Sequence, residues 1–332
     1  MNKKTTSGSS KKNPARMTAR TVEKPEAIEP HPGRGADDSP PLRWSNAPAG
    51  ALLSWETKAG RWTLDFSRPL IMSIINLTPD SFSDGGRFSD PQAAVEAALA
   101  EEKGGADIFD LGAESTRPGS EPVSAEEEWN RLAPVIEGIR ARSSKPVSID
   151  TYRASVAEKA LQGGAAILND IYAGRKDPRM LLLAAEWGVP IILMHMLGEP
   201  RTMQVDPHYD DVVAEVHDFL LERARAAEAA GVPKEHIILD PGIGFGKNMG
   251  HNLALIKNFH KAMPAGYRKL MALSRKAFLG RIMNGAPPLE RDGLTCVANT
   301  LSIIQGAEIV RVHKSAPNKA AADLIQALRD AE

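Results

Sequence analysis

The sequence predicts an α/β protein, a (β/α)8 TIM barrel with a disordered N-terminal extension. Three observations indicate this class: apolar runs alternate with amphipathic stretches eight times, polar residues follow these runs, and the repeats occupy about 250 residues, the usual length of such a barrel. A doubly wound open sheet is the second interpretation, because strand order cannot be taken from one sequence.

The eight expected strands are short, mostly apolar runs, and they lie at residues 71–75, 107–111, 146–149, 166–168, 190–194, 236–239, 269–273 and 308–312. The expected helices have apolar residues at three- and four-residue spacing, with examples at 93–103, 125–141, 154–162, 212–230 and 320–328. Strand, loop and helix follow one another in the order that a barrel of βα units requires.

The first expected strand is followed by a loop rich in residues that interrupt regular structure. The apolar run stops at Asn76, and residues 79–86 read PDSFSDGG before a helical pattern starts near Pro91. Loops at the carboxyl ends of strands are where α/β enzymes build their sites, so Asn76 is placed to face a ligand. A solvated surface loop is the alternative interpretation.

Polar residues also stand at the carboxyl ends of the other expected strands. They are the 114–119 stretch, Asp150, Asn169, His195, Asp240, residues 274–276, and Arg311 with His313. In a barrel these ends meet at one mouth, so the side chains would converge there. Solvated surface does not account for this pattern, and we interpret it as a functional site.

The segment 242–247 reads GIGFGK and matches neither common glycine-rich nucleotide motif. A GxxxxGK[ST] loop needs one more residue of spacing and a Ser or Thr where Asn248 stands, and a GxGxxG fingerprint has its third glycine one residue later. We interpret the segment as a tight turn after Asp240, in which glycines let the backbone approach a flat ligand and Phe245 forms a wall of the pocket.

Composition and charge exclude several classes of function. The 332 residues are 42% apolar and 25% charged, with a net charge of −1, so nothing indicates wholesale attraction to nucleic acid or to an anionic membrane. No apolar run approaches the ~20 residues that cross a bilayer. The single cysteine, Cys296, favours a reducing compartment, and we therefore expect a cytoplasmic protein.

Residues 1–50 differ from the rest of the chain. They hold seven of the 24 prolines and almost no large apolar side chains. Such a segment cannot bury enough surface to offset its ordering entropy, and it lacks the apolar core of a secretory signal. We therefore expect a disordered tail over 1–50 and the barrel over 51–332.

Neither a metal cluster nor a catalytic triad can be assigned. The histidines lack metal-binding spacing, and no Ser–His–Asp set follows from their order. The chemistry is therefore expected to rest on binding and electrostatics, without a protein nucleophile.

Seven groups of motifs in chain order resemble the dihydropteroate synthase family. They read NLTPDSFSDGG (76–86), DLGAESTRPGS (110–120), SIDTYRASVAEKAL with LNDI (148–171), LMHM with PRTMQ (193–204), LDPGIGFGK with HNL (239–253), SRKAFLG (274–280) and RVH (311–313). The resemblance implies a TIM barrel that condenses 7,8-dihydropterin-6-ylmethyl diphosphate with p-aminobenzoate in folate biosynthesis. It also implies a sulfonamide target.

The resemblance implies a pterin slot of carboxylates, an amide, a lysine and apolar walls. Asp240 suits the 2-amino and N3–H edge of the ring, and Lys276 the carbonyl and N5 side. The implied pterin residues are Asp150, Asn169, Met194, Asp240, Phe245 and Lys276.

The resemblance also implies a diphosphate site and a magnesium ion. Arg311 and His313, two residues apart on one strand, point to the same side and would grip the diphosphate with Thr116. Asn76 would contact Mg²⁺, whose other ligands would be phosphate oxygens and waters.

For p-aminobenzoate the resemblance implies an anion site and an aromatic sandwich. Ser274 and the backbone N–H groups after it, at the start of the helical stretch SRKAFLG, would hold the carboxylate. Phe82, Arg117 and Pro118 would come from two loops and close over the ring.

Two alternative functions use the same fold. One is a methyltetrahydrofolate-dependent methyltransferase, which would not need the ESTRPG, SRK and RVH segments. The other is a non-catalytic pterin-binding paralogue, suggested only by departures from the family pattern at Ala113 and Lys314; Ala277 is a third departure. The resemblance further implies a homodimer formed through helices near the carboxyl end.

Overall fold

The computed structural model describes Met1 and residues 51–78, 90–115 and 122–331, and the predicted closed barrel is confirmed. Eight parallel strands close in the order β10-β3-β4-β5-β6-β7-β8-β9, which excludes the open sheet. The strands are β3 (Leu70–Asn76), β4 (Ile108–Gly112), β5 (Val147–Asp150), β6 (Ile167–Asp170), β7 (Ile191–Met194), β8 (Ile237–Asp240), β9 (Arg268–Met271) and β10 (Ile309–Val312). The expected tail, apart from Met1, lies outside the described residues.

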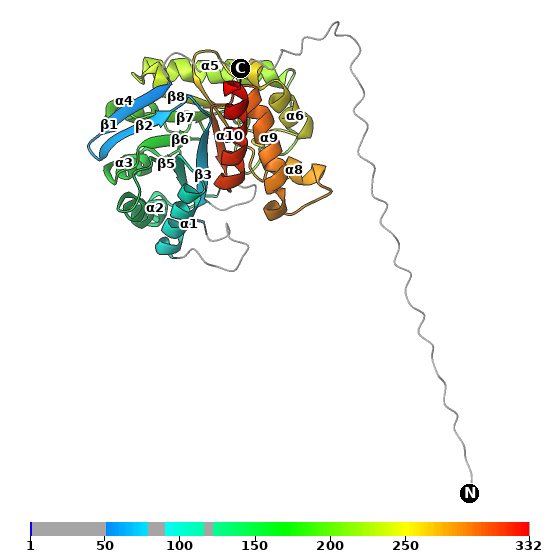
Figure 1. Ribbon diagram of the computed structural model, residues 1–332, viewed down its shortest axis with the longest axis horizontal. Helices are drawn as coiled ribbons and strands as arrows, with labels where there is room; N and C mark the ends of the chain where they lie inside the picture. The colour runs from blue at the N-terminus through cyan, green and yellow to red at the C-terminus, as the bar shows by residue number, and fades with distance from the viewer. Residues whose placement is uncertain (2–50, 79–89, 116–121, 332) are drawn as a thin grey trace. The chain divides into compact units, whose positions relative to one another are not determined.

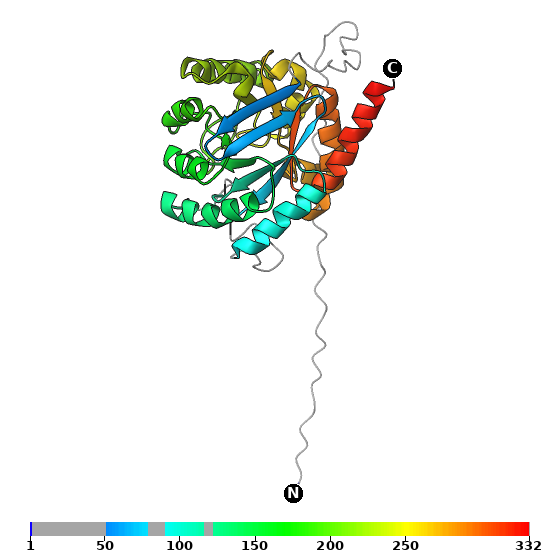
Figure 2. The same ribbon diagram turned by 60° about the vertical axis from the view of Figure 1, so that its left-hand side comes forward.

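Helices surround the strands on the outside of the barrel (Figures 1 and 2). The described helices are α1 (Pro91–Lys103), α2 (Ala125–Arg140), α3 (Ala154–Gln162), α4 (Arg179–Trp187), α5 (Val212–Ala229), α6 (Met249–Lys257), α7 (Phe259–Ala262), α8 (Ala277–Ile282), α9 (Asp292–Ile304) and α10 (Ser315–Asp330), with 3-10 turns η2 (Lys234–His236) and η3 (Pro288–Arg291). Polar caps start several of them, as where the Asp90 side chain accepts from Gln92 N. None of the described helices is long and apolar enough to cross a membrane.

A β-hairpin that the sequence reasoning did not predict precedes the barrel. Strands β1 (Leu52–Thr57) and β2 (Gly60–Asp65) pair antiparallel, with Trp55 opposite Trp62, and alternate residues of both strands are buried. Trp55 Nε1 donates to the carbonyl oxygen of Ala166 at 2.9 Å, immediately before β6. The hairpin, blue in Figure 2, therefore packs at the amino ends of the barrel strands.

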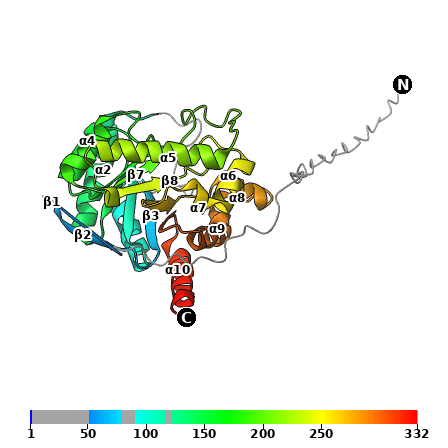
Figure 3. The same cartoon turned by 90° about the horizontal axis from the view of Figure 1, so that it is seen from above.

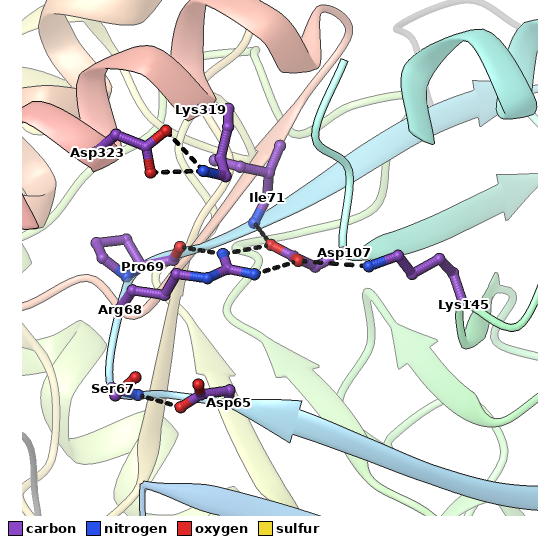
Figure 4. Close-up of polar contacts among 9 residues, drawn as sticks. All are labelled: Asp65, Ser67, Arg68, Pro69, Ile71, Asp107, Lys145, Lys319 and Asp323. Carbon is purple, nitrogen blue, oxygen red and sulfur yellow. Dashed lines mark hydrogen bonds and ion pairs between the residues drawn. The ribbon is translucent and has the colours of Figure 1, made fainter. Parts of the chain in front are cut away.

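Asp107 ties together the amino ends of three barrel strands (Figure 4). It lies before β4, accepts from Ile71 N of β3 at 3.0 Å and receives both arms of Arg68 at 2.6 and 2.9 Å. Lys145 Nζ, before β5, lies 3.8 Å from the same carboxylate. Structural ion pairs thus occupy the amino ends of the barrel strands. The carboxyl ends of the strands, on the opposite side, form the mouth of the barrel.

Replacing Trp55 tests the packing of the hairpin. Trp55→Ala should lower the free energy of unfolding by about 3–5 kcal/mol, because it leaves a cavity where the buried indole ring packed. Urea denaturation followed by circular dichroism measures the change. The control is Leu52→Ala on the same strand, where the side chain is 64% exposed and the change should stay within about 0.5 kcal/mol. Equal effects of the two substitutions would contradict this packing.

Candidate active site at the barrel mouth

Four neighbouring strands share one register row near the mouth. Asn76, Gly112, Asp150 and Asn169 pair in turn across β3, β4, β5 and β6. A Cβ at Gly112 would lie 3.7 Å from both Asn76 Oδ1 and Asp150 Oδ2, so the glycine leaves no side chain between these two oxygens. Amide oxygens are ligands that Mg²⁺ accepts, so Asn76 Oδ1 could serve as the single protein ligand of a magnesium ion whose other ligands would be phosphate and water. Asp150 Oδ2, by contrast, already accepts from Arg311 Nη2 at 2.7 Å.

Arg311 joins β10 to β4 and β5 across the mouth. Its Nε donates to Asp110 Oδ2 at 2.6 Å and its Nη2 to Asp150 Oδ2 at 2.7 Å. Asn169 Nδ2 donates to Asp110 Oδ2 at 3.1 Å, which completes a network of four side chains from four strands. The predicted diphosphate residue Arg311 and the predicted pterin residues Asp150 and Asn169 are therefore in one hydrogen-bonded group.

Burial dominates the electrostatics of this group. It raises the pKa of Asp150, the Arg311 guanidinium opposes that rise, and the neighbouring Asp110 carboxylate adds to it. The same two carboxylates raise the already high pKa of Arg311, so the guanidinium stays charged. One cation therefore balances two acidic groups inside the barrel.

Asp240 ends β8 and is 3% exposed. Its Oδ1 accepts from Gly242 N at 2.7 Å, a bond that also shapes the turn after the strand. Burial raises the pKa of Asp240 to about 6, against the lowering effects of the Gly242 bond, Lys276 and Arg311. The carboxylate is thus charged at pH 7 and able to accept N–H donors from a ligand.

Lys276 and Phe245 lie against each other. Lys276 Nζ is 4.2 Å from the centre of the Phe245 ring, and burial lowers the pKa of the lysine to about 8 while Asp240 opposes the shift. Phe245 also packs against a buried apolar cluster that contains Met194, Met196 and other residues. The two predicted apolar walls, Met194 and Phe245, are therefore in one cluster beside Lys276.

Ser274 and His313 are linked directly. Ser274 Oγ lies 2.9 Å from His313 Nδ1 and accepts from the backbone N of His313 at 3.2 Å. The prediction that a helix begins at Ser274 was wrong: α8 begins at Ala277 and has six residues. Arg275 has a φ of 59°, a left-handed conformation that a right-handed α-helix does not contain, so the helix cannot include it. Its guanidinium Nε and Nη2 each donate to Asp292 at 2.6 Å and hold this turn.

Four predicted site residues lie outside the described residues: Phe82, Thr116, Arg117 and Pro118. The segments beside the second gap are described. Arg153 Nη1 donates to Glu114 Oε2 at 2.6 Å, and its Nη2 donates to the carbonyl oxygen of Val123 at 2.9 Å. One arginine thus contacts the chain on both sides of residues 116–121.

Sequence reasoning assigned no role to Asp110 or Lys247, which the structure places in or beside this site. Asp110 is 0% exposed and Lys247 is 2% exposed. The signal for Asp110 was available, because it is the only charged residue in the apolar strand IFDLG. The burial of Lys247 had no such signal, since a lysine after a glycine-rich turn is ordinarily solvated.

Comparison with known proteins adds to this geometry. Residues 72–313 match a family described as pterin binding enzyme. The Escherichia coli K12 dihydropteroate synthase is 44% identical over 252 residues, which is 76% of this chain and 88% of that protein. A Yersinia pestis dihydropteroate synthase, solved with a sulfonamide drug complex, superposes with a TM-score of 0.78 at 37% identity, covering 84% of this chain and 100% of that one. The Xanthomonas albilineans enzyme in complex with 7,8-dihydropteroate gives 0.73 at 40% identity, covering 80% and 96%.

The raised pKa of Asp240 predicts a pH-dependent effect of Asp240→Asn on stability. The folded chain holds this proton more tightly than the unfolded chain, so the contribution to stability is complete below pH 3.8 and is lost as pH rises through about 6. Removing the carboxylate should therefore stabilise the chain at pH 8 by about 1–3 kcal/mol and have little effect at pH 4.

Urea denaturation at the two pH values measures this difference. Asp210→Asn, at a side chain that is 100% exposed, is the matched control and should change stability at neither pH. A loss of stability in Asp240→Asn at pH 8 would contradict the prediction.

Proposed function

The chain belongs to the dihydropteroate synthases, a family of pterin binding enzymes, and we propose that its barrel mouth condenses 7,8-dihydropterin-6-ylmethyl diphosphate with p-aminobenzoate. It is a transferase, and the products of this reaction are 7,8-dihydropteroate and pyrophosphate. One observation carries the proposal for the site: Asp240 at the end of β8, Lys276 against the Phe245 ring of the turn after β8, and the ion-paired Arg311 all lie at the carboxyl ends of the barrel strands. Recognition of a heterocycle and of an anion is thereby combined in one place.

The pterin ring is proposed to lie between the apolar walls with its polar edge toward the strand ends. Ionised Asp240 would accept from the 2-amino group and N3–H, and Lys276 would donate to the carbonyl and N5 side. Asp150 and Asn169 would pair with the rest of the edge, while Met194 and Phe245 would contact the faces. The burial of these groups strengthens each polar contact, because little water competes for it.

The diphosphate is proposed to bind beside Arg311 and His313. Asp110 and Asp150 hold Nε and Nη2 of the guanidinium, so the Nη1 edge would face the phosphate oxygens. Thr116 is proposed to contribute from outside the described residues. Mg²⁺ at Asn76 would neutralise charge on the departing pyrophosphate.

The p-aminobenzoate is proposed to bind with its amine beside the methylene carbon of the first substrate. Ser274, already bonded to His313, would hold its carboxylate, and Phe82, Arg117 and Pro118 would close over its ring. Because a sulfonamide resembles this substrate, we propose that such a drug competes here. Since Cys296 stands alone in the sequence, we place the enzyme in the cytoplasm.

The proposed chemistry is a dissociative substitution at the pterin methylene carbon. The carbon–oxygen bond breaks, the pyrophosphate leaves with the electron pair, and Arg311 and His313 stabilise its charge. The pterin ring delocalises the positive charge on the methylene group. The arylamine is neutral at pH 7, so it forms the carbon–nitrogen bond with its own lone pair and needs no protein base to activate it. The positively charged nitrogen that results then loses one proton to water. Holding the two substrates in contact supplies much of the rate.

A pyrophosphate-release assay tests the function. The purified full chain should release one pyrophosphate per dihydropteroate formed, and only when the pterin diphosphate, p-aminobenzoate and Mg²⁺ are all present. Chromatography of the pteroate product confirms the stoichiometry. Pterin binding without pyrophosphate release would instead favour the non-catalytic paralogue, and methyl transfer from methyltetrahydrofolate would favour the methyltransferase.

We also propose that the enzyme is a homodimer formed through α9 and α10, which lie side by side (Figures 1 and 3). Each helix exposes two large apolar side chains one turn apart. Val297 and Leu301 are 55% and 52% exposed, and Leu324 and Leu328 are 61% and 51% exposed. A second copy of the chain would cover this apolar surface, in agreement with the family expectation.

Charge placed on this surface tests the dimer. Val297→Glu with Leu324→Glu should shift the protein from dimer to monomer, because a carboxylate cannot be buried there without a partner. Size-exclusion chromatography with light scattering measures the mass. Leu182→Glu, on α4 and 47% exposed in the native chain, is the control and should leave the dimer intact. A monomeric native chain would exclude the dimer.

A further inference from the structure

Lys247 is a buried lysine to which the proposed chemistry gives no task. It ends the turn that follows β8, and its Nζ lies 2.8 Å from His195 Nδ1. The same Nζ donates to the backbone carbonyl oxygen of Phe245 at 3.0 Å. His195 comes directly after β7, so one amine joins the segments that follow two neighbouring strands.

The two segments also meet through their backbones. A Cβ at Gly242, where φ is 65°, would lie 1.8 Å from the carbonyl oxygen of His195, and one at Gly246, where φ is 62°, would lie 2.4 Å from that of Leu197. Tyr209 Oη donates to the carbonyl oxygen of Gly246 at 2.9 Å. The turn is therefore packed against the segment after β7, and Lys247 is the side chain that crosses between them.

From these contacts we propose that Lys247 is a positioning residue, which bridges His195 and the Phe245 carbonyl and thereby fixes the Phe245 wall of the pterin slot. The proposal rests on the proposed function, because it takes Phe245 as a face of that slot. It assigns a specific task to the lysine of the GIGFGK turn: the lysine acts through the backbone and does not touch the substrate.

The protonation states suit this bridge. Burial lowers the pKa of His195 to about 2, so its imidazole is neutral and Nδ1 can accept a hydrogen bond. Burial lowers the pKa of Lys247 to about 7, with Asp240 opposing the shift. A neutral amine has two N–H donors and an ammonium has three, so both acceptors can be served in either state.

Phe245 is then held at two points. Lys247 fixes its carbonyl oxygen, and Lys276 faces its ring. Asp240 is held separately by the Gly242 N–H. Loss of Lys247 should therefore release the wall of the slot while leaving the carboxylate in place, which weakens the binding of the ring and spares the second substrate.

Lys247→Met tests the proposal, because methionine keeps the length of the side chain but has no donor. The dissociation constants of 7,8-dihydropterin-6-ylmethyl diphosphate and of its ring fragment 6-hydroxymethylpterin, measured by calorimetry on the full chain, should rise about tenfold. The KM for p-aminobenzoate should stay at the native value. Lys247→Gln, which retains N–H donors, should recover part of the affinity.

His195→Phe tests the bridge from its other end and keeps an aromatic ring against Phe219, whose centre is 4.8 Å away. It should weaken pterin binding in the same direction, and it also provides the measurement if Lys247→Met does not fold. Lys145→Met, at the amino end of the barrel, is the control and should bind pterin as the native chain does.

Native pterin affinity in folded Lys247→Met, or in His195→Phe, would overturn the positioning role even if the melting temperature fell. A rise in the KM for p-aminobenzoate equal to the rise for the pterin would also overturn it, since general loosening of the site would explain both. Failure of the native chain to bind either pterin would overturn the proposed function instead. The two failures are therefore distinguishable.

Discussion

The ion pair of Arg311 with Asp110 and Asp150 is the constraint on which the mouth of the barrel depends. Removing two carboxylates from water costs several kcal/mol each, about the full stability of many domains, unless a cation accompanies them. Arg311 supplies that cation from β10, and Asn169 supplies a further donor to Asp110. The four strands that carry these side chains must keep their register, because a shift of one residue would turn a charge into the apolar layer.

The pKa values of three further ionisable groups in or beside the site are shifted by the same burial. Asp240, Lys276 and Lys247 all have pKa values moved toward neutrality, mainly because water is excluded around them. Such groups reduce the stability of the empty chain but exchange protons and hydrogen bonds readily with a bound ring. Apart from the Arg311 ion pair, the site is therefore held in place by the apolar barrel and by the hairpin and ion pairs at the opposite end.

Periodicity was sufficient to predict eight βα units, because each strand is a short apolar run and each is followed by an amphipathic helix, whereas closure of the sheet into a barrel is shown by the strand order of the structure. The same local rule predicted which residues stand at the mouth, including Asn76, Asp150 and Asp240. It did not predict the partner of Arg311, since Asp110 is 201 residues away in the sequence and only barrel closure brings the two together. The hairpin was not predicted because it is stabilised by contacts distant in the sequence, such as that of Trp55 with Ala166. The start of α8 was not predicted because it depends on the backbone conformation of Arg275.

Closure of the sheet between β3 and β10 has a consequence for biosynthesis. The first and last barrel strands to leave the ribosome are neighbours, so the growing chain carries two unpaired sheet edges until the final strand emerges. Partly made barrels of this kind expose strand edges that other chains can join, which is the situation that chaperones relieve. A nonsense mutation before residue 309 would therefore be expected to yield aggregates rather than a smaller working enzyme.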